Sequence, residues 1–588
     1  MKSKKICDIQ AFPGSNIIGS TSISCGSSPE KKISWVRSQL IGEDVNLQTP
    51  FGSRRLTYAD HTASGRSMLC VENYILQQVL PFYGNTHTSD SFVGQKTTRM
   101  VEEATEYVKT CLRAGPSDAL IFCGSGATAA MKRLQEAMGI AVAGDLRERI
   151  VLAEEERWVV FVGPWEHHSN LLSWRQTTAE VVEIGVDRRS GMPDMEALEA
   201  QLGCMKRTNR RMLGSFSACS NVTGVICDTR GLARLLHQYG AFACFDFATS
   251  GPYVEIDMAS EDSSERYDAV FLSPHKFVGG PSSPGILVMN KALYGLTHCP
   301  PSTCGGGVVE YVNDFNPNDT IYNDDIEERE DAGTPPIIQK IRAALAFRVK
   351  ELVGYDLINL LESFYIESAM ERLLPNPAIH ILGNLEPKRL AILSFLIFPS
   401  HVNTTTAANS KGKPFSGRFV AKLLNDLFGI QARGGCSCAG PYGHHLLAVD
   451  ESFSHGIRSH IQKGYMGMKP GWTRVSFAYY MTKFEFEFIL SAIEFIAAYG
   501  HRFLSVYAFD WATGDWSYDM KLPMMDCSVG MIKKIAEEKE FLGRGKETKI
   551  FARYLKSARK IAISLPEKPL LPRRVPKNVD RNLIYFRI

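Results

Sequence analysis

Several features that mark specialised classes of protein are missing from this chain of 588 residues. The formal net charge is only +3, which argues against an extended nucleic-acid surface. No uncharged apolar run reaches the ~18 residues that a membrane span needs. The segment "FEFILSAIEFIAAYG" is interrupted by Glu494, and we expect it to form an amphipathic helix. No internal repeat is present. The sequence therefore predicts neither a nucleic-acid partner nor a membrane partner.

A disulfide framework is also lacking. The 14 Cys are scattered without a repeated spacing, which is typical of free thiols in a reducing compartment, and we expect a cytoplasmic protein. No secretory signal opens the chain. The first thirty residues are rich in Ser and poor in acidic residues, as in a disordered tail, with an organellar targeting peptide as the alternative.

What is present is the composition of a globular protein, with 44% hydrophobic and 22% charged residues. The chain is too long for one ordinary core, so two domains with appendages are expected. We place a partly disordered extension at residues 1–50, a larger domain at 51–335, a smaller domain at 336–504 and an extension without an assigned role at 505–588.

The pattern from Thr57 to Asn290 is that of an α/β fold. Short apolar runs alternate with helical stretches, which predicts a mainly parallel sheet covered by helices on both faces. One helix has clear ends, with Asp228 or Thr229 at its start and Gly240 at its finish. A long helical segment, 337–374, then leads to a smaller α+β domain, whose strands lie in "RLAILSFLIF" and "WTRVSFAYY".

Two charged residues stand at the ends of predicted strands, where ligands bind in parallel α/β sheets. Lys276 follows "AVFLS", and a lysine in a dry cleft has a lowered pKa and can form a Schiff base with an aldehyde. Asp246 ends "AFACF", where a carboxylate could pair with a pyridinium nitrogen. The alternatives are a surface lysine on a turn and a carboxylate that caps the next turn.

The segment "CGSGATAAMKRL" predicts a strand, a Gly-rich turn and the start of a helix. Free N–H groups and the helix dipole favour an anion there, so Gly126, Ala127 and Thr128 could cradle a phosphate. Ser273 and His275 flank Lys276 and could donate to the same phosphate.

In "WEHHSN", His167 follows another predicted strand, where an imidazole could stack on a flat ring or relay protons. An ordinary turn histidine is the alternative. Because the side chains of adjacent histidines diverge, a metal shared by His167 and its neighbour is not expected.

Two thiols, Cys436 and Cys438, lie beside Arg433 in the Gly-rich segment "ARGGCSCAGPYG". A mobile, partly exposed Cys near positive charge is a candidate thiolate nucleophile. Inert thiols or half of a metal site are the alternatives, but no matching Cys pair at zinc spacing lies nearby, so no metal is predicted. Arg474, in "WTRVSFAYY", could fork onto a substrate carboxylate, with an ordinary surface arginine as the alternative.

Together these residues describe one ligand, an aromatic aldehyde with a phosphate arm and a pyridine nitrogen that reacts with an amino acid. That ligand is pyridoxal 5′-phosphate (PLP). Over about residues 55–500 the sequence resembles the class V aminotransferase family of fold-type I PLP enzymes. It is most similar to cysteine desulfurases and to the desulfurase domain of molybdenum-cofactor sulfurases. The motifs that carry the resemblance are "YADHTASGR", "YGNTHT", "GSGAT", "EHHSN", "SNVTG", "FDFATSG", "SPHKFVGGPSSPG", "AGTPP", "RGGCSCAG" and "TRVSFAYY".

The resemblance implies a role for each matching residue. Lys276 would form the Schiff base, and Cys438 would be the nucleophile that receives sulfur, with Cys436 as a neighbour that could resolve a persulfide. The cofactor would be held by a further set: Asp246 at the pyridine nitrogen, His167 on the ring, Asn221 at the phenolic oxygen or the substrate carboxylate, and Thr128, Ser273 and His275 at the phosphate. Arg474, with Arg433 nearby, would bind the substrate carboxylate. Thr334, in "AGTPP", resembles a phosphate contact that family members lend across a dimer interface.

Three departures from the family pattern bear on the substrate. Thr249 stands where desulfurases usually carry Gln, as a cofactor-binding residue with a shorter reach to the cofactor oxygen. Ala127 stands where a hydroxyl residue is common, which leaves only its backbone N–H for the phosphate. A sizeable insertion also follows Cys438 and could cover the active site.

The resemblance favours a cysteine desulfurase-like enzyme that converts L-cysteine to L-alanine and an enzyme persulfide. It also implies a homodimer with a shared active site and a sulfur-acceptor protein as partner. A PLP-dependent aminotransferase or lyase acting on another amino acid is one alternative, and a non-catalytic scaffold with a PLP-enzyme fold is another.

Overall fold

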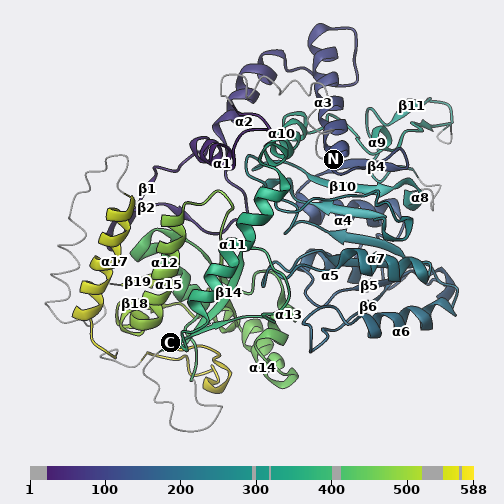
Figure 1. The fold of residues 1–588 in the computed structure, drawn as a ribbon. Coiled ribbons are helices and arrows are strands. Elements are labelled where there is room, and N and C mark those ends of the chain that lie inside the picture. The colour runs from purple at the N-terminus through teal and green to yellow at the C-terminus, as the bar shows by residue number, and fades with distance from the viewer. Residues whose placement is uncertain (1–22, 295–299, 317–318, 400–411, 520–546, 569–572) are drawn as a thin grey trace.

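The larger of two main sheets dominates the computed structural model (Figure 1), which describes residues 23–294, 300–316, 319–399, 412–519, 547–568 and 573–588. Its seven strands lie in the order β4-β10-β9-β8-β7-β5-β6. Strand β10 is antiparallel to both neighbours, and the other pairs are parallel. The strands are β4 (Asp118–Cys123), β5 (Val159–Val162), β6 (Glu180–Glu183), β7 (Met212–Ser217), β8 (Phe242–Asp246), β9 (Ala269–Leu272) and β10 (Gly285–Asn290). The predicted α/β fold with a mainly parallel sheet is confirmed.

Helices cover both faces of this sheet because its strands are apolar on both sides. Alternate residues of β4 enter different hydrophobic clusters, Leu120 and Phe122 on one face and Ile121 and Cys123 on the other. The first face is covered by α3 (Phe92–Cys111), α6 (Met195–Lys206), α7 (Thr229–Gln238) and α10 (Ile337–Val353). The second is covered by α4 (Gly126–Ala137) and α5 (His168–Arg175).

The ends predicted for helix α7 are correct. The Asp228 side chain accepts a hydrogen bond from the backbone N–H of Gly231, and the chain turns away at Gly240, whose φ is +79°. Such a φ is easily adopted only without a Cβ, so glycine at this position ends the helix cleanly.

The smaller sheet has four antiparallel strands in the order β13-β14-β17-β16. They are β13 (Ile379–Ile381), β14 (Ile392–Ile397), β16 (Arg433–Gly435) and β17 (Trp472–Ser476). Strands β13, β14 and β17 share a second large hydrophobic cluster with α11 (Tyr355–Leu373), α12 (Gly417–Phe428) and α15 (Lys483–Phe503). The insertion that follows Cys438 forms α13 (Gly440–Leu446) and α14 (Glu451–Gln462).

The long helical segment expected from the sequence is two helices, α10 and α11, that meet at Gly354. This residue has a φ of +91°, which a right-handed helix cannot include. The break lets α10 contribute its side chains to the core of the larger sheet, while Tyr365 and Leu373 of α11 enter the core of the smaller one.

The C-terminal segment adds to the smaller sheet's core. A hairpin of β18 (Tyr507–Phe509) and β19 (Trp516–Tyr518) precedes helix α17 (Glu547–Ser564), which lies along α15 in Figure 1. Phe551 of α17 stacks on Phe488 of α15, with ring centroids 4.1 Å apart and planes inclined by 8°. The last residues pack on α14, where the backbone N–H of Asp580 donates to His460 Nε2.

The N-terminal segment is structured from Pro29 onwards; of the tail expected over the first thirty residues, residues 1–22 lie outside the described part of the chain. Helix α1 (Pro29–Ser38) buries Trp35 and Val36 against α10. Strand β3 (Thr57–Tyr58) pairs with β15 (Ile430–Gln431). This pairing places the start of the chain beside the smaller sheet. The remaining short elements are β1 (Asn46–Thr49), β2 (Gly52–Arg55), α2 (Leu69–Tyr74), α8 (Lys291–Tyr294), β11 (Val309–Tyr311), β12 (Ile321–Tyr322) and α9 (Ile326–Arg329).

One helical stretch in the described part of the chain, Lys483–Val506, is long and apolar enough to cross a membrane. Its most apolar window is 72% buried inside the protein. The stretch contains α15, which lies in the middle of the smaller sheet's core, so its apolar character is explained by packing.

Candidate active site

The predicted site residues meet outside the carboxyl ends of the larger sheet's parallel strands. Asp246 is the last residue of β8, and Lys276 lies in the short turn Pro274–Lys276 that follows β9. His167 and Asn221 follow β5 and β7. Because neighbouring parallel strands end at one edge, residues that lie more than 100 positions apart in the sequence share one cleft.

Lys276 has the electrostatic surroundings of a reactive amine. Burial lowers the pKa of its amine from 10.5 to about 8; Asp246 acts in the opposite direction, and Arg474 and Arg433 lower the pKa further. A lysine with such a pKa is partly neutral near pH 8, and the neutral amine is the form that condenses with a carbonyl. Burial at the strand end therefore disfavours the charged form of Lys276 and favours its neutral, reactive amine.

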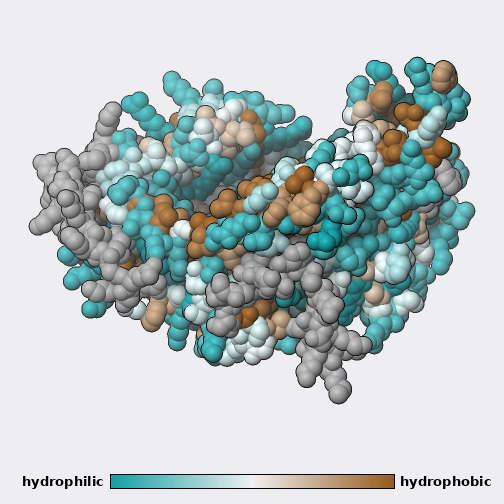
Figure 2. Space-filling model, turned by 90° about the horizontal axis from the view of Figure 1, so that it is seen from above, coloured by the Kyte–Doolittle hydropathy of each residue, from teal (hydrophilic) through white to brown (hydrophobic). Residues whose placement is uncertain are grey.

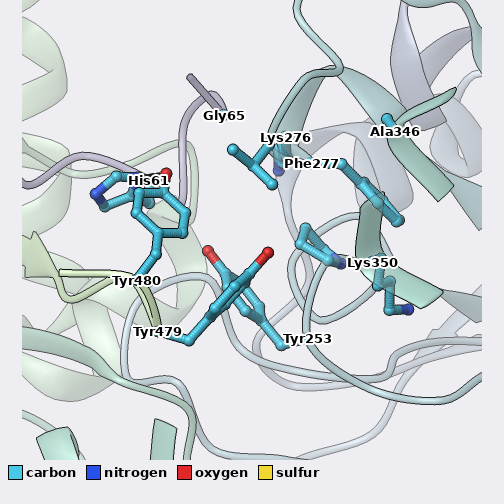
Figure 3. A pocket seen from close by; sticks show the side chains of 11 residues that line it. His61, Gly65, Tyr253, Lys276, Phe277, Ala346, Lys350, Tyr479 and Tyr480 are labelled. Carbon is cyan, nitrogen blue, oxygen red and sulfur yellow. Dashed lines mark hydrogen bonds between the residues drawn. The ribbon is translucent and has the colours of Figure 1, made fainter. Parts of the chain in front are cut away.

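A small cavity beside Lys276 is walled by aromatic side chains (Figure 3). His61, Tyr253, Tyr479 and Tyr480 line it, and its volume of about 10 Å³ is what a single water molecule needs. In Figure 3 the hydroxyl groups of Tyr253 and Tyr479 are on the side of their rings that faces Lys276. Sequence reasoning did not single out these aromatic residues, although His61 lies within the motif "YADHTASGR", and Tyr479 and Tyr480 lie within "TRVSFAYY".

Asp246 is well placed to pair with a protonated ring nitrogen. It is 6% exposed, and its Oδ1 accepts a 2.8 Å hydrogen bond from the backbone N–H of Ala248. Burial raises the pKa of this carboxyl, while the Ala248 N–H and Lys276 oppose that rise. A buried carboxylate gains most from a cationic partner. Thr249, predicted at the cofactor oxygen, is buried on the turn just after Asp246.

The predicted phosphate turn begins helix α4. Gly126 has a φ of +62°, and a Cβ there would lie only 2.9 Å from both the Ser273 Oγ and the His275 ring. The Ala127 N–H donates to Ser273 Oγ at 2.9 Å, so this donor is directed at a side chain in the present structure. Thr128 is exposed at the same turn. The structure thus brings together the five phosphate ligands predicted from within one chain, whereas Thr334 was predicted to come from a second copy.

The segment "EHHSN" carries His167, the predicted ring-stacking residue, and also contacts the phosphate turn. The Nδ1 atom of His167 accepts the backbone N–H of Ser169 at 3.1 Å, which leaves the ring proton on Nε2. Burial and the nearby Lys276 lower the pKa of His167 to about 4, so its ring is neutral. The Ser169 hydroxyl lies 2.6 Å from that of Thr128. Ser169 was missed from the sequence, where a serine after a histidine pair carries no signal of its own.

Glu166, the first residue of this segment, was also missed by sequence reasoning. Its side chain anchors the segment through hydrogen bonds. Its carboxylate accepts hydrogen bonds from the backbone N–H groups of Gly163 and Ser217 and from the side chains of Ser217 and Asn170. Burial raises the pKa of Glu166 to about 7, while these donors oppose that rise. The carboxylate thereby fixes the backbone that presents His167.

Arg474, predicted to bind a substrate carboxylate, is 3% exposed and is held by two hydrogen bonds. Its Nη2 donates to Asp60 Oδ1 at 2.8 Å, and its Nη1 donates to the backbone oxygen of Asn221 at 2.9 Å. Burial lowers the pKa of Arg474, and Asp60 opposes that shift. Arg433 is exposed and lies 4.0 Å from the other oxygen of Asp60. Asp60 is a further site residue that sequence reasoning missed.

The buried polar atoms around the described cleft that have no hydrogen-bond partner include Arg474 Nε and Asn221 Oδ1. An unsatisfied buried group costs about 1–3 kcal/mol, and groups left in this state are common where a ligand completes the hydrogen bonding. The donor set, a lysine amine, a buried carboxylate, a neutral imidazole and a glycine turn, fits PLP. No group of three or more His, Cys, Asp or Glu side chains suited to a metal ion occurs in the described chain.

Cys436 and Cys438 are both half-buried on the loop between β16 and α13. This loop is anchored on the larger sheet rather than extended into solvent. The Asn221 side chain donates to the Ser437 carbonyl at 2.7 Å, and the His168 N–H donates to the Cys438 carbonyl at 2.8 Å. Cys438 is close enough to Arg474 for a thiolate there to raise the pKa of the guanidinium.

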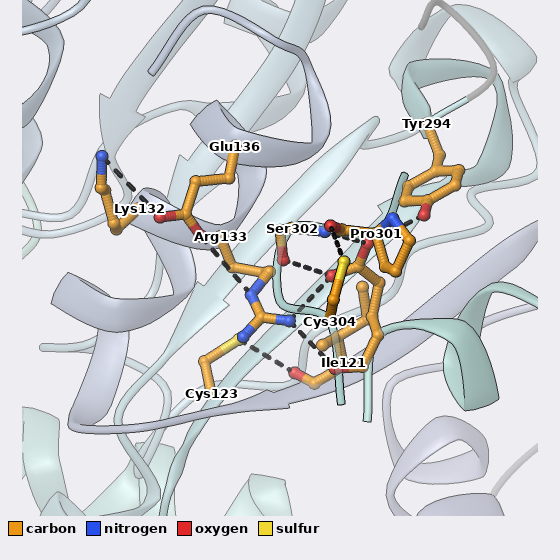
Figure 4. A network of polar contacts seen from close by, with 10 residues as sticks. Ile121, Cys123, Lys132, Arg133, Glu136, Tyr294, Pro301, Ser302 and Cys304 are labelled. Carbon is orange, nitrogen blue, oxygen red and sulfur yellow. Dashed lines mark hydrogen bonds and ion pairs between the residues drawn. The ribbon is translucent and has the colours of Figure 1, made fainter. Parts of the chain in front are cut away.

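Thr334 is exposed, on a segment anchored by a buried carboxylate. Glu330 accepts hydrogen bonds from Arg133 and from Tyr294, both at 2.8 Å, and from the Ser302 backbone and hydroxyl. The side chains of Arg133, Tyr294 and Ser302 can be followed in Figure 4. The network fixes the chain just before Thr334 and leaves that residue available at the surface.

Comparison with known proteins identifies the family of the chain. The family model described as Aminotransferase class-V matches residues 57–488. A probable cysteine desulfurase of Staphylococcus epidermidis is 26% identical over 394 residues, which are 66% of this chain and 88% of that protein. A probable cysteine desulfurase of Staphylococcus aureus is 25% identical over 382 residues, 64% of this chain and 85% of the relative.

Solved structures share the fold. The apo structure of a cysteine desulfurase from Thermococcus onnurineus superposes with a TM-score of 0.60 at 21% identity, and covers 79% of this chain and 98% of its own. A cysteine desulfurase from Escherichia coli superposes with a TM-score of 0.55 at 22% identity, and covers 79% of this chain and 97% of its own.

Proposed function

Because the chain belongs to the class V aminotransferase family of PLP-dependent enzymes, we propose that it binds PLP at Lys276 and transfers sulfur from L-cysteine to Cys438. The cysteine desulfurases among its relatives support this choice within the family. The single observation that carries the proposal is the place of Cys438, whose loop is docked onto Asn221 beside the carboxylate-binding Arg474.

Each residue has a distinct task in this reaction. Bound in the cleft, PLP would supply an electron sink for the α-carbon of the amino acid. Arg474 orients the substrate carboxylate, and Lys276 Nζ takes the α-proton. Asp246 would hold the pyridine nitrogen of the cofactor and keep it protonated. His167, whose ring carries its proton on Nε2, would stack on the cofactor ring.

The sulfur step balances between the substrate and one protein thiol. Cys438, as a thiolate, attacks the sulfur atom of the substrate. A sulfur–sulfur bond forms and the carbon–sulfur bond breaks, and its electron pair stays with the carbon, which takes up a proton. The products are alanine and a persulfide on Cys438.

The proposal is tested by measuring alanine and reductant-released sulfide from L-cysteine. Cys438→Ala is expected to lose sulfide release, while Cys436→Ala, the matched control on the same loop, keeps the first transfer. A Cys438→Ala enzyme with full activity would remove the sulfur-transfer assignment. Formation of a keto acid and pyridoxamine phosphate from another amino acid would instead identify an aminotransferase.

The assembly belongs to the same proposal. We infer a homodimer in which Thr334 reaches the phosphate turn of a second copy. Exposed apolar side chains on and after α2, which lies near the top of Figure 1, include Leu76, Leu80, Tyr83 and Phe92. Figure 2, which shows the molecule from above, has several hydrophobic patches on this face. Leu76 and Phe92 are 60% and 68% exposed, and burying such side chains against a second copy would stabilise a dimer.

A further inference from the structure

His168, the second histidine of "EHHSN", touches the Cys438 loop twice. Its backbone N–H donates to the Cys438 carbonyl oxygen at 2.8 Å. Its ring Nε2 accepts the backbone N–H of Gly440 at 3.0 Å, which places the ring proton on Nδ1. One residue at the start of α5 thus holds the chain on both sides of Ala439, immediately after the candidate nucleophile.

The ring contact takes the place of a helix cap. Gly440 is the first residue of α13, and the first N–H groups of a helix need partners from outside the helix. The residue at the N-cap position is Ala439, which has no side-chain acceptor to offer. His168 supplies that acceptor from another part of the fold. The approach is close, since a Cβ at position 440 would lie 3.1 Å from Nε2.

The loop itself has an unfavourable backbone. Ser437 and Cys438 both have left-handed φ values, +52° and +56°. A non-glycine residue is strained in that region, and the conformation persists only where its surroundings enforce it. The surroundings here are the Asn221 side chain on one side and His168 on the other.

We propose that His168 is a positioning residue for sulfur transfer, which fixes the backbone at Cys438 and so sets where the thiol meets the substrate. This rests on the proposed function of Cys438. The two adjacent histidines then have different roles. His167 would contact the ring of the cofactor, and His168 positions the loop that carries the nucleophile. Their rings diverge, with centroids 6.3 Å apart and planes inclined by 48°.

Substitutions of His168 distinguish this role from simple packing. Glutamine has the chain length to present an oxygen where Nε2 lies, whereas asparagine is one methylene shorter and does not reach Gly440. We therefore expect His168→Gln to keep sulfide release. His168→Asn and His168→Ala are expected to lose about 100-fold, as a small displacement of a reacting group does. His455→Ala, an exposed histidine on α14, is the matched control.

Two readouts on the PLP-loaded enzyme separate the steps. The absorbance change on adding L-cysteine reports the chemistry at Lys276 and is expected to stay at the wild-type rate in every variant. Hydrogen exchange of residues 436–446 reports the loop, and is expected to speed up roughly tenfold in the Ala and Asn variants only.

If hydrogen exchange of residues 436–446 is unchanged in His168→Ala, the proposal is overturned. It is also overturned if exchange is faster but sulfide release is undiminished. A parallel loss of the absorbance change also overturns it, because the substitution would then act on the whole site. If the wild-type enzyme itself releases no sulfide, the proposed function fails and the role in sulfur transfer fails with it. The exchange experiment still decides whether His168 holds the loop.

Discussion

Arg474 and Asp60 form an ion pair of 2.8 Å in the cleft, with side chains that are only 3% and 19% exposed. The pair joins β17 of the smaller sheet to the segment after β3, which runs beside that sheet because β3 pairs with β15. Asp60 therefore holds in place the guanidinium that we expect to meet the substrate carboxylate.

Replacing Asp60 by Asn leaves Arg474 buried without its counter-ion. We expect a loss of about 3 kcal/mol in the free energy of unfolding, the cost of breaking a buried pair. The matched control is Asp515→Asn, which breaks a pair with Arg418 whose side chains are 72% and 47% exposed and should cost less than about 1 kcal/mol. Urea unfolding measures both, and equal losses would contradict the assigned role of Asp60.

Gly126→Ala tests the phosphate turn. The new Cβ would meet Ser273 and His275 at 2.9 Å, in a residue whose φ is +62°. We expect the dissociation constant for PLP to rise at least tenfold, or about 1.4 kcal/mol. Gly144→Ala is the control, since no atom lies within 4 Å of a Cβ there. Absorbance titration measures the affinity, and unchanged binding in Gly126→Ala would count against the phosphate assignment.

The lowered pKa of Lys276 gives the cofactor-free protein a defined pH dependence. The pKa falls from 10.5 to about 8 on folding, so between these values the unfolded chain binds a proton that the folded chain does not. Stability contributed by this group therefore rises with pH across that window. Below it both states are protonated, and the folded protein carries the full cost of about 3 kcal/mol.

Lys276→Met removes that cost, so the variant is expected to be the more stable protein at neutral pH. Its advantage should shrink as pH rises from 8 towards 10.5. Urea unfolding of the two cofactor-free proteins at pH values below, within and above the window measures the difference. A difference that does not change with pH would mean that Lys276 is not desolvated.

The C-terminal helix α17 is expected to be an integral part of the smaller sheet's core. Phe551 is 4% exposed and stacks on Phe488, so Phe551→Ala should cost about 3 kcal/mol or more. Ile563→Ala on the same helix removes a side chain that is 64% exposed and should cost little. Thermal unfolding gives the comparison, and an unaffected Phe551→Ala protein would show that α17 is dispensable for stability.

The residues at strand ends could be predicted because a parallel sheet gathers them by its own geometry. Lys276, Asp246 and His167 each follow a short apolar run, and the structure places each at the carboxyl end of a strand. The phosphate turn could be found for a similar reason, since a strand, a glycine turn and a helix form a local pattern.

Residues that act across the two sheets could not be found in this way. Asp60 contacts the cleft through Arg474 of the smaller sheet, and Tyr479 follows a strand of that sheet, so both depend on how the smaller sheet docks, which no periodicity in the sequence encodes. The role of His168 is seen only from its hydrogen bond with Gly440, which is 272 positions away in the sequence. The break between α10 and α11 was visible as Gly354, but a single glycine in a helical pattern does not by itself indicate an end.

The most direct test of the central claim is the identity of the lysine that binds PLP. Borohydride reduction of the PLP-loaded enzyme, followed by peptide mass mapping, is expected to find the reduced adduct on Lys276. Lys350 is the internal control, because it lines the same cavity and burial also lowers its pKa to about 8. An adduct on Lys350 or on any other lysine, or no adduct at all, would contradict the account.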